Sequence, residues 1–157
     1  MKNLFIFLVL SISLVGCVPS ATLTKEQTEK IYSHEVNLKK DELKRKLLLY
    51  VNETFVSGKT VLQTNEDGLL SGNGIVDLKK IKGLMGETIS IIKMELTFII
   101  KYDDGNYKVK WVVKDLSNEK GIFSRDYWGY YTADIEKTIA DNDKELSDYV
   151  SNKANDF

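Results

Sequence analysis

Apolar and polar residues alternate with a period of two in three parts of the chain, which indicates β-strands with one buried face. The longest of these parts is 89–102, where every second residue from Ile92 to Tyr102 is apolar or aromatic. The other two are 30–38 and 107–113, and β-rich segments at 60–64 and 69–78 add two strands. This patterning predicts an antiparallel sheet that is covered on one side.

Glycine-containing turns join these strands into hairpins. The sequence NEDG at 65–68 separates the second and third strands, and DDGN at 103–106 separates the fourth and fifth. Between the third and fourth strands, we expect 79–88 to form a loop. Gly72 and Gly74 inside the third strand predict a bulge or a close backbone approach.

Two segments, 42–56 and 133–152, have the period of amphipathic helices. We predict that Asp41 is either the N-cap or an acidic first-turn residue of the first helix and that this helix ends at Gly58. Thr132 is the predicted N-cap of the second helix. The apolar stripes contain Leu43, Leu47, Tyr50, Val51 and Phe55 in the first helix, and Ile135, Ile139, Leu146, Tyr149 and Val150 in the second. The order strand, helix, four strands, helix predicts an α+β fold, a two-layer sandwich with an antiparallel sheet.

The first 16 residues have the features of an export signal. Met1-Lys2-Asn3 is short and basic, and the apolar run 4–13 has about ten residues, half of the roughly 20 that a transmembrane helix needs. Leu14-Val15-Gly16-Cys17 follows and resembles the lipobox of bacterial lipoproteins. The resemblance implies cleavage before Cys17, a diacylglyceryl group with palmitate-type acyl chains on its sulfur, and attachment to a membrane. The alternatives are a secretory signal with a chance cysteine and a buried helix of a cytosolic protein.

We therefore divide the chain into a signal peptide (1–16), a lipidated tether (17–28) and a single α+β domain (29–157). Removing 16 of the 157 residues leaves 141, enough for one domain with its own core. Without Lys2 the mature part has 21 basic and 23 acidic side chains. The resulting net charge of about −2 is not the basic excess that indicates nucleic-acid binding. Val18, where an aspartate would signal inner-membrane retention, implies the outer membrane in a Gram-negative cell.

The domain is similar to a family of bacterial envelope domains of unknown function that is described as having a TATA-binding-protein-like fold. The similarity extends over about 23–116. It rests on LTKEQ at 23–27, IY at 31–32, KDEL at 40–43, NETFVS at 52–57, KTVLQ at 59–63 and GNG at 72–74. The resemblance implies this fold, and it implies no activity and no catalytic residues.

The segment 117–131 has no regular period but contains five aromatic residues in nine positions. These are Phe123, Tyr127, Trp128, Tyr130 and Tyr131. Aromatic side chains dominate many binding contacts, so the segment is a candidate platform for an envelope protein or a cell-wall glycan, with Arg125 and Asp126 as hydrogen-bonding groups. The alternative is that the rings pack over the sheet end and seat the last helix.

Residues with catalytic chemistry are sparse. His34 is the only histidine, so a Ser–His pair or most zinc sites would have to use it, whereas on an alternating strand it is more simply a packed or edge residue. Asp103-Asp104 is interpreted as part of a turn, and 141–143 (DND) as a solvated helix face rather than a calcium loop. The outer sheet face is interpreted as solvated, with anionic head groups as the alternative ligand of its lysines, Lys93, Lys101, Lys108, Lys110 and Lys114.

Together these features predict a lipid-anchored envelope protein without cofactor or metal. We expect no enzymatic activity and no nucleic-acid binding, but binding of a protein or cell-wall partner through the aromatic segment or the open sheet face. Two alternatives are a small envelope hydrolase, with a pocket that brings His34 to a serine or carboxylate, and a carrier of an apolar ligand. The carrier requires a cavity of roughly 300–1,000 Å³ between sheet and helices.

Overall fold

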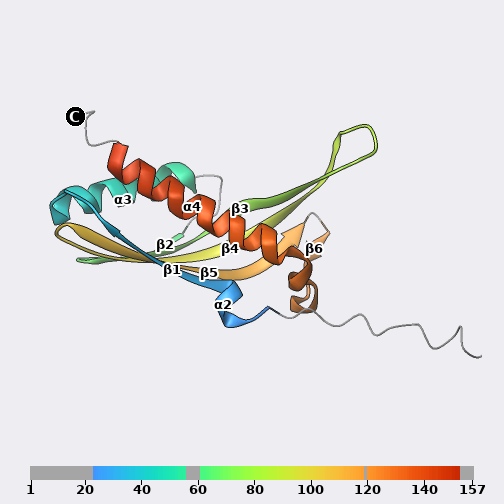
Figure 1. Ribbon diagram of the computed structural model, residues 1–157, viewed down its shortest axis with the longest axis horizontal. Coiled ribbons are helices and arrows are strands. Elements are labelled where there is room, and N and C mark those ends of the chain that lie inside the picture. The colour runs from blue at the N-terminus through green and yellow to red at the C-terminus, as the bar shows by residue number, and fades with distance from the viewer. Residues whose placement is uncertain (1–22, 56–60, 119, 153–157) are drawn as a thin grey trace, which may run out of the picture.

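The computed structural model describes residues 23–55, 61–118 and 120–152, so the signal peptide, Cys17 and Gly58 lie outside the described residues. One antiparallel sheet is covered on one face by two long helices (Figure 1), which confirms the two-layer α+β sandwich. The elements are α2 (Lys25–Thr28), β1 (Glu29–Glu35), α3 (Lys40–Thr54), β2 (Val61–Glu66), β3 (Leu69–Lys82), β4 (Thr88–Asp103), β5 (Asn106–Asn118), β6 (Gly121–Ile122), the 3₁₀ helix η1 (Arg125–Tyr131) and α4 (Thr132–Asn152).

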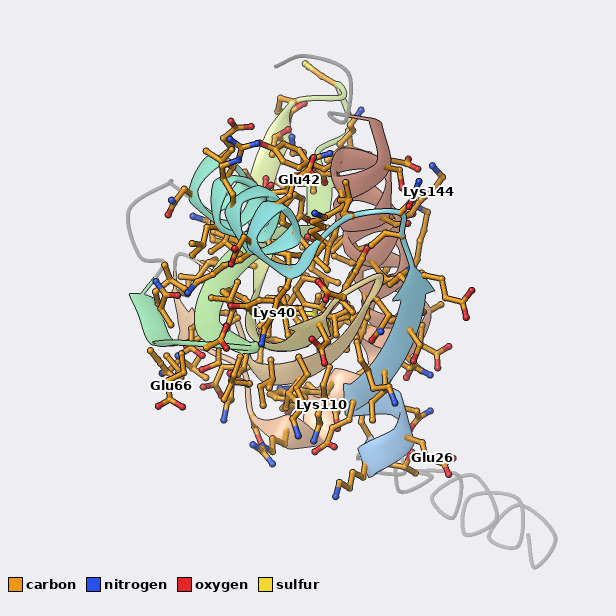
Figure 2. The ribbon with its side chains drawn as sticks, turned by 90° about the vertical axis from the view of Figure 1, so that its left-hand side faces the viewer. Glu26, Lys40, Glu42, Glu66, Lys110 and Lys144 are labelled. Atoms are coloured by element: carbon orange, nitrogen blue, oxygen red, sulfur yellow. The ribbon has the colours of Figure 1, made fainter. Side chains whose placement is uncertain are left out.

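The strands are ordered β1-β5-β4-β3-β2, and β6 pairs with β5. The helix α3 therefore carries the chain from the edge strand β1 across the sheet to the opposite edge. The alternation in β4 is confirmed, because the six residues that face the helices, from Ile92 to Tyr102, are at most 4% exposed. Figure 2 shows the two layers side on, with Glu42 and Lys144 on the helices and Lys110 beyond the opposite face of the sheet.

Aromatic rings fill the space between the sheet and α3. The ring of Phe55 stacks on Phe98 with a centroid distance of 5.6 Å and lies 6.5 Å from Trp111. It also covers Gly74, where an added Cβ would lie only 2.3 Å from Phe55 Cδ1. The close backbone approach predicted for this strand is thus present at Gly74. The β2–β3 pairing shifts register between Leu62 and Thr64, so a bulge in β2 lies opposite Gly72. The β3–β4 pairing shifts between Asp77 and Lys79 and again between Ile81 and Lys82.

Polar groups join the two helices across their shared seam. The buried Lys46 Nζ donates a hydrogen bond to the Val150 carbonyl at 2.9 Å. The Tyr50 hydroxyl donates to the Asn142 carbonyl at 3.2 Å. Because both acceptors belong to α4, these bonds fix the position of α3 relative to α4.

The beginning of α3 differs from one of the two predicted roles of Asp41. The N-cap is Lys39, and Asp41 lies in the first helical turn. The cap is instead supplied from the β4–β5 turn, where Asp104 Oδ1 accepts a hydrogen bond from the Lys40 backbone N–H at 2.7 Å. Asp104 satisfies a donor that the helix itself leaves unpaired, which is the function of a capping side chain.

Three other boundaries correct the sequence-based prediction. The loop expected at 79–88 is only a tight turn, since β3 continues to Lys82 and β4 starts at Thr88. The last four residues of the expected tether form α2, whose N-cap Thr24 takes part in a capping box with Gln27. The segment 117–131 is largely regular, with β6 and η1 in it. Short elements of this kind carry too few residues to show a period in the sequence.

Candidate functional site

Three of the five rings in the aromatic segment hold that segment on the domain. Trp128 is 2% exposed, and its indole N–H donates to the Phe123 carbonyl at 3.4 Å. Phe123 and Tyr131 are partly buried against the core, with their ring centroids 6.1 Å apart. These three rings therefore pack against the domain, which agrees with the alternative that the aromatic residues cover the end of the sheet.

Tyr127 and Tyr130 differ from the other three because they face solvent. Their exposed fractions are 57% and 58%, and their rings stack with a centroid distance of 6.4 Å and an interplanar angle of 28°. They are three residues apart in η1, and a 3₁₀ helix places such residues on the same side. The result is an exposed aromatic pair on a support that Trp128 fixes.

The polar neighbours predicted for this surface are only partly in place. The Arg125 guanidinium carbon lies 5.2 Å from the centre of the Trp128 ring, a cation–π arrangement that engages its charge. The side chain of Asp126 lies outside the described residues. In β6, within the same segment, Ile122 is 72% exposed. Arg125 is exposed, but it is already in contact with a ring of the segment.

A groove of about 340 Å³ lies beneath η1 and was not predicted. Its walls come from Leu23 and α2, from β5, and from Arg125 with Trp128. On its floor Glu29 binds Lys110 at 2.7 Å. The hydrogen bond from Lys110, helped by the charges of Lys25 and Lys114, lowers the pKa of the Glu29 carboxyl. Sequence patterns cannot reveal such a groove because its walls are distant in the chain.

His34 belongs to a polar cluster between β1, β5 and α4. Its Nε2 lies 3.2 Å from Asp143 Oδ1, and its ring stacks on Tyr107 at 4.7 Å. The same carboxylate oxygen accepts a hydrogen bond from the Trp111 indole N–H at 3.5 Å. The geometry thus brings His34 to a carboxylate, as the hydrolase alternative required. However, the carboxylate is shared with a core tryptophan, and the groove beneath η1 does not include His34.

This cluster corrects the interpretation of 141–143 as a solvated helix face. Asn142 and Asp143 are 8% and 6% exposed. Only Asp141 is exposed, and it pairs with Lys137 at 2.5 Å. The helix α4 lies flat on the sheet, so two consecutive polar residues turn inward and need partners there.

A second groove of about 720 Å³ lies between β3 and α4. It includes Ile75, Val76 and Leu78, but most of its remaining lining is polar or charged, with Asp77, Asp134, Lys137, Thr138, Asp141, Asn142 and Glu145. Ligand cavities for apolar molecules are lined mainly by hydrophobic side chains. The volume would suffice for the carrier alternative, and the chemistry of the lining does not suit it.

The remaining candidate residues belong to a turn or to the outer face of the sheet. Asp103 Oδ1 accepts from the Asp104 N–H at 2.9 Å, as expected for turn residues. Of the outer-face lysines, only Lys110 is half-buried, and Lys93, Lys101, Lys108 and Lys114 are exposed. In the described part of the chain, no three His, Cys, Asp or Glu side chains are grouped to hold a metal ion. Within the same residues, no helix has the length and apolarity needed to cross a bilayer.

Comparison with known proteins identifies the fold. No family profile matches the sequence, and a search of curated proteins finds no match either. The structure is similar to a DUF4468 family protein from Bacteroides ovatus, with a TM-score of 0.59 and 11% identity over 88% of this chain and 91% of that one. It is also similar to a TBP-like protein from Parabacteroides distasonis, with a TM-score of 0.58 and 10% identity over 83% and 97% of the two chains. The TATA-binding-protein-like fold implied by the sequence resemblance is confirmed.

Proposed function

We propose that this chain is a lipid-anchored protein of the bacterial envelope, a non-enzymatic module that binds another envelope protein through Tyr127 and Tyr130. The observation that carries the proposal is the contrast within one short segment. Three of its rings are used for packing, and the remaining two are left stacked in solvent at 57% and 58% exposure. Exposed tyrosines on a fixed support lose little conformational freedom on binding, which is why they anchor many interfaces.

A protein partner fits this surface better than a cell-wall glycan. A sugar site needs several polar groups that converge around the rings. Here the Arg125 guanidinium lies over Trp128, and the exposed side chain of β6 is the apolar Ile122. Exposed aromatic side chains such as Tyr127 and Tyr130 are enriched at the core of protein–protein interfaces.

The proposed anchor would keep this surface near the membrane. The lipobox-like sequence before Cys17 supports lipid attachment at that residue. Leu23, which lines the groove beneath η1, is six positions after Cys17 in the chain. A chain of that length reaches at most about 20 Å. The partner would therefore be a protein that is itself close to the membrane surface.

Intact mass tests the anchor. The protein purified from detergent-solubilised membranes should begin at Cys17 and carry added acyl mass, and Cys17→Ala should lose both features. A full-length chain without added mass in the wild-type preparation would contradict the lipoprotein assignment.

Cross-linking in intact cells tests the binding surface. The double variant Tyr127→Ala, Tyr130→Ala should lose a defined protein adduct, because it removes both exposed rings and leaves the packed ones. Ile31→Ala is the matched control, since Ile31 is 62% exposed on the open sheet face. An adduct that persists in the double variant, or one lost equally in Ile31→Ala, would contradict the assignment. If the wild type binds purified cell wall and the double variant does not, the ligand is a glycan and not a protein.

A further inference from the structure

The β3–β4 hairpin projects from the body of the domain as a narrow two-stranded arm (Figure 1). The pairing of β4 with β5 begins at Lys93, so 88–92 pair with β3 alone. A register shift between Asp77 and Lys79 lies at the root of the arm. Bulges bend and twist a strand, which explains why the arm leaves the plane of the sheet. An isolated two-stranded hairpin is only marginally stable in water, so binding to a partner would stabilise this arm.

The tip of the arm carries the most exposed large apolar side chains of the described residues. Leu84 and Met85 have relative exposures of 108% and 96%, and Ile89 behind them is 55% exposed. Side chains of this size are rarely left together in water without a function. They lie at the outermost point of the hairpin, where the domain offers no surface to cover them.

Several backbone groups of the tip are already paired within the tip. The N–H of Gly83 donates to the Glu87 carbonyl at 2.8 Å, and that of Gly86 donates to the Gly83 carbonyl at 3.0 Å. The Met85 N–H donates to Glu87 Oε2 at 3.1 Å. A backbone that satisfies its own donors loses less on leaving water, which is the condition for entering a bilayer. The turn thus exposes two apolar side chains while three of its N–H groups are bonded within the turn.

The arm has the charge that an anionic membrane surface attracts. Between 79 and 88 there are three lysines and one glutamate. Lys79 pairs with Asp134 at 2.8 Å, and Lys80 and Lys82 are exposed. Lysines that flank apolar residues contact anionic head groups while the apolar residues enter the acyl region.

From this combination we infer that the tip of the β3–β4 hairpin inserts Leu84 and Met85 into a bilayer that contains anionic phospholipid. The occupant is a lipid surface rather than a protein because the apolar tip is small and convex and directly follows the exposed Lys80 and Lys82. The inference is strengthened by the proposed lipid anchor, which would hold the domain within about 20 Å of the same bilayer through the chain before Leu23. The hairpin would then be a second contact that orients the domain.

A fluorescent label at the tip tests the inference. Cys17 is the only cysteine of the chain, and its thiol is consumed if it carries lipid, so Leu84→Cys supplies one reactive thiol. The full protein from membranes would be labelled with an environment-sensitive dye and reconstituted into vesicles of phosphatidylethanolamine and phosphatidylglycerol. Glu66→Cys is the matched control, because the exposed Glu66 adjoins the turn at the other end of β3, roughly 45 Å from the tip.

The label at position 84 should shift its emission to the blue and be quenched by nitroxide-labelled lipid, and the label at position 66 should do neither. Lys80→Glu with Lys82→Glu should lower the ratio of inserted to free tips by roughly tenfold or more, as should vesicles of neutral lipid. A water-exposed label at position 84 would overturn the inference, and so would a blue shift without lipid quenching, which indicates contact with protein. The intact mass of the same sample shows whether Cys17 carries lipid, so failure of tip insertion is distinguished from absence of the lipid anchor.

Discussion

Replacing Gly74 by alanine tests the packing between β3 and α3 directly. An added Cβ would lie 2.3, 2.7 and 2.9 Å from three ring atoms of Phe55, whereas ordinary contacts begin near 3.4 Å. The ring would have to move by about 1 Å, but it is stacked on Phe98 and is only 2% exposed. Overpacking of this kind costs about 1–3 kcal/mol, and alanine in a strand recovers about 0.5–1 kcal/mol of chain entropy. We therefore expect a net loss of up to about 2.5 kcal/mol in the free energy of unfolding.

Urea unfolding measures this loss as a lower midpoint with an unchanged slope. The control is the same substitution in a Phe55→Leu background, where the smaller side chain removes the clash. There the cost of Gly74→Ala should fall by about 1 kcal/mol or more, which makes the two substitutions non-additive. If Gly74→Ala stabilises the protein, or if the two effects add within about 0.5 kcal/mol, the steric reasoning is refuted.

Three further predictions concern polar contacts. Asp104→Ala should cost about 0.5–2 kcal/mol by removing the cap from the Lys40 N–H, and a urea midpoint equal to that of the wild type would contradict this role. Asp143→Ala should cost about 1–3 kcal/mol because the Trp111 indole N–H loses its acceptor, with a change in tryptophan emission as an independent readout. Burial raises the pKa of Tyr107 from 10.0 to about 12, so the folded protein holds this proton more tightly than the unfolded chain. Stability should be full below pH 10 and fall between pH 10 and about 12, and the fall should be shallower in Tyr107→Phe.

Most of the fold could be predicted because its signals are local. The alternation from Ile92 to Tyr102 requires only that one sheet face be buried, and the structure buries that face. The hairpin turns also depend on nearby residues, as Gly68 and Gly105 with their positive φ angles of 79° and 75° show. The error at 79–88 had a local cause as well. Gly83 and Gly86 belong to a tight turn, and the lysine-rich residues before them pair as a strand without an apolar period.

The candidate site could be predicted only in part. Composition identified the aromatic segment, but five adjacent rings give no indication of which ones will be buried. The structure separates them because η1 turns Trp128 toward the core and leaves Tyr127 and Tyr130 outside. The exposed tip at Leu84 was missed for a related reason, since two apolar residues in a short turn resemble any buried pair until the length of the hairpin is known.

The sequence by itself determined five of the six described strands, the two long helices and the α+β class, because each depends on neighbouring residues and their period. Only the tertiary structure decided that Asp104 caps α3, that His34 meets Asp143, and that the groove beneath η1 exists. In the two hydrogen-bonded pairs the partners are 64 and 109 residues apart. Contacts over such distances form only when hydrophobic burial has set the sheet order and seated α4 on the sheet, and no local pattern encodes that order.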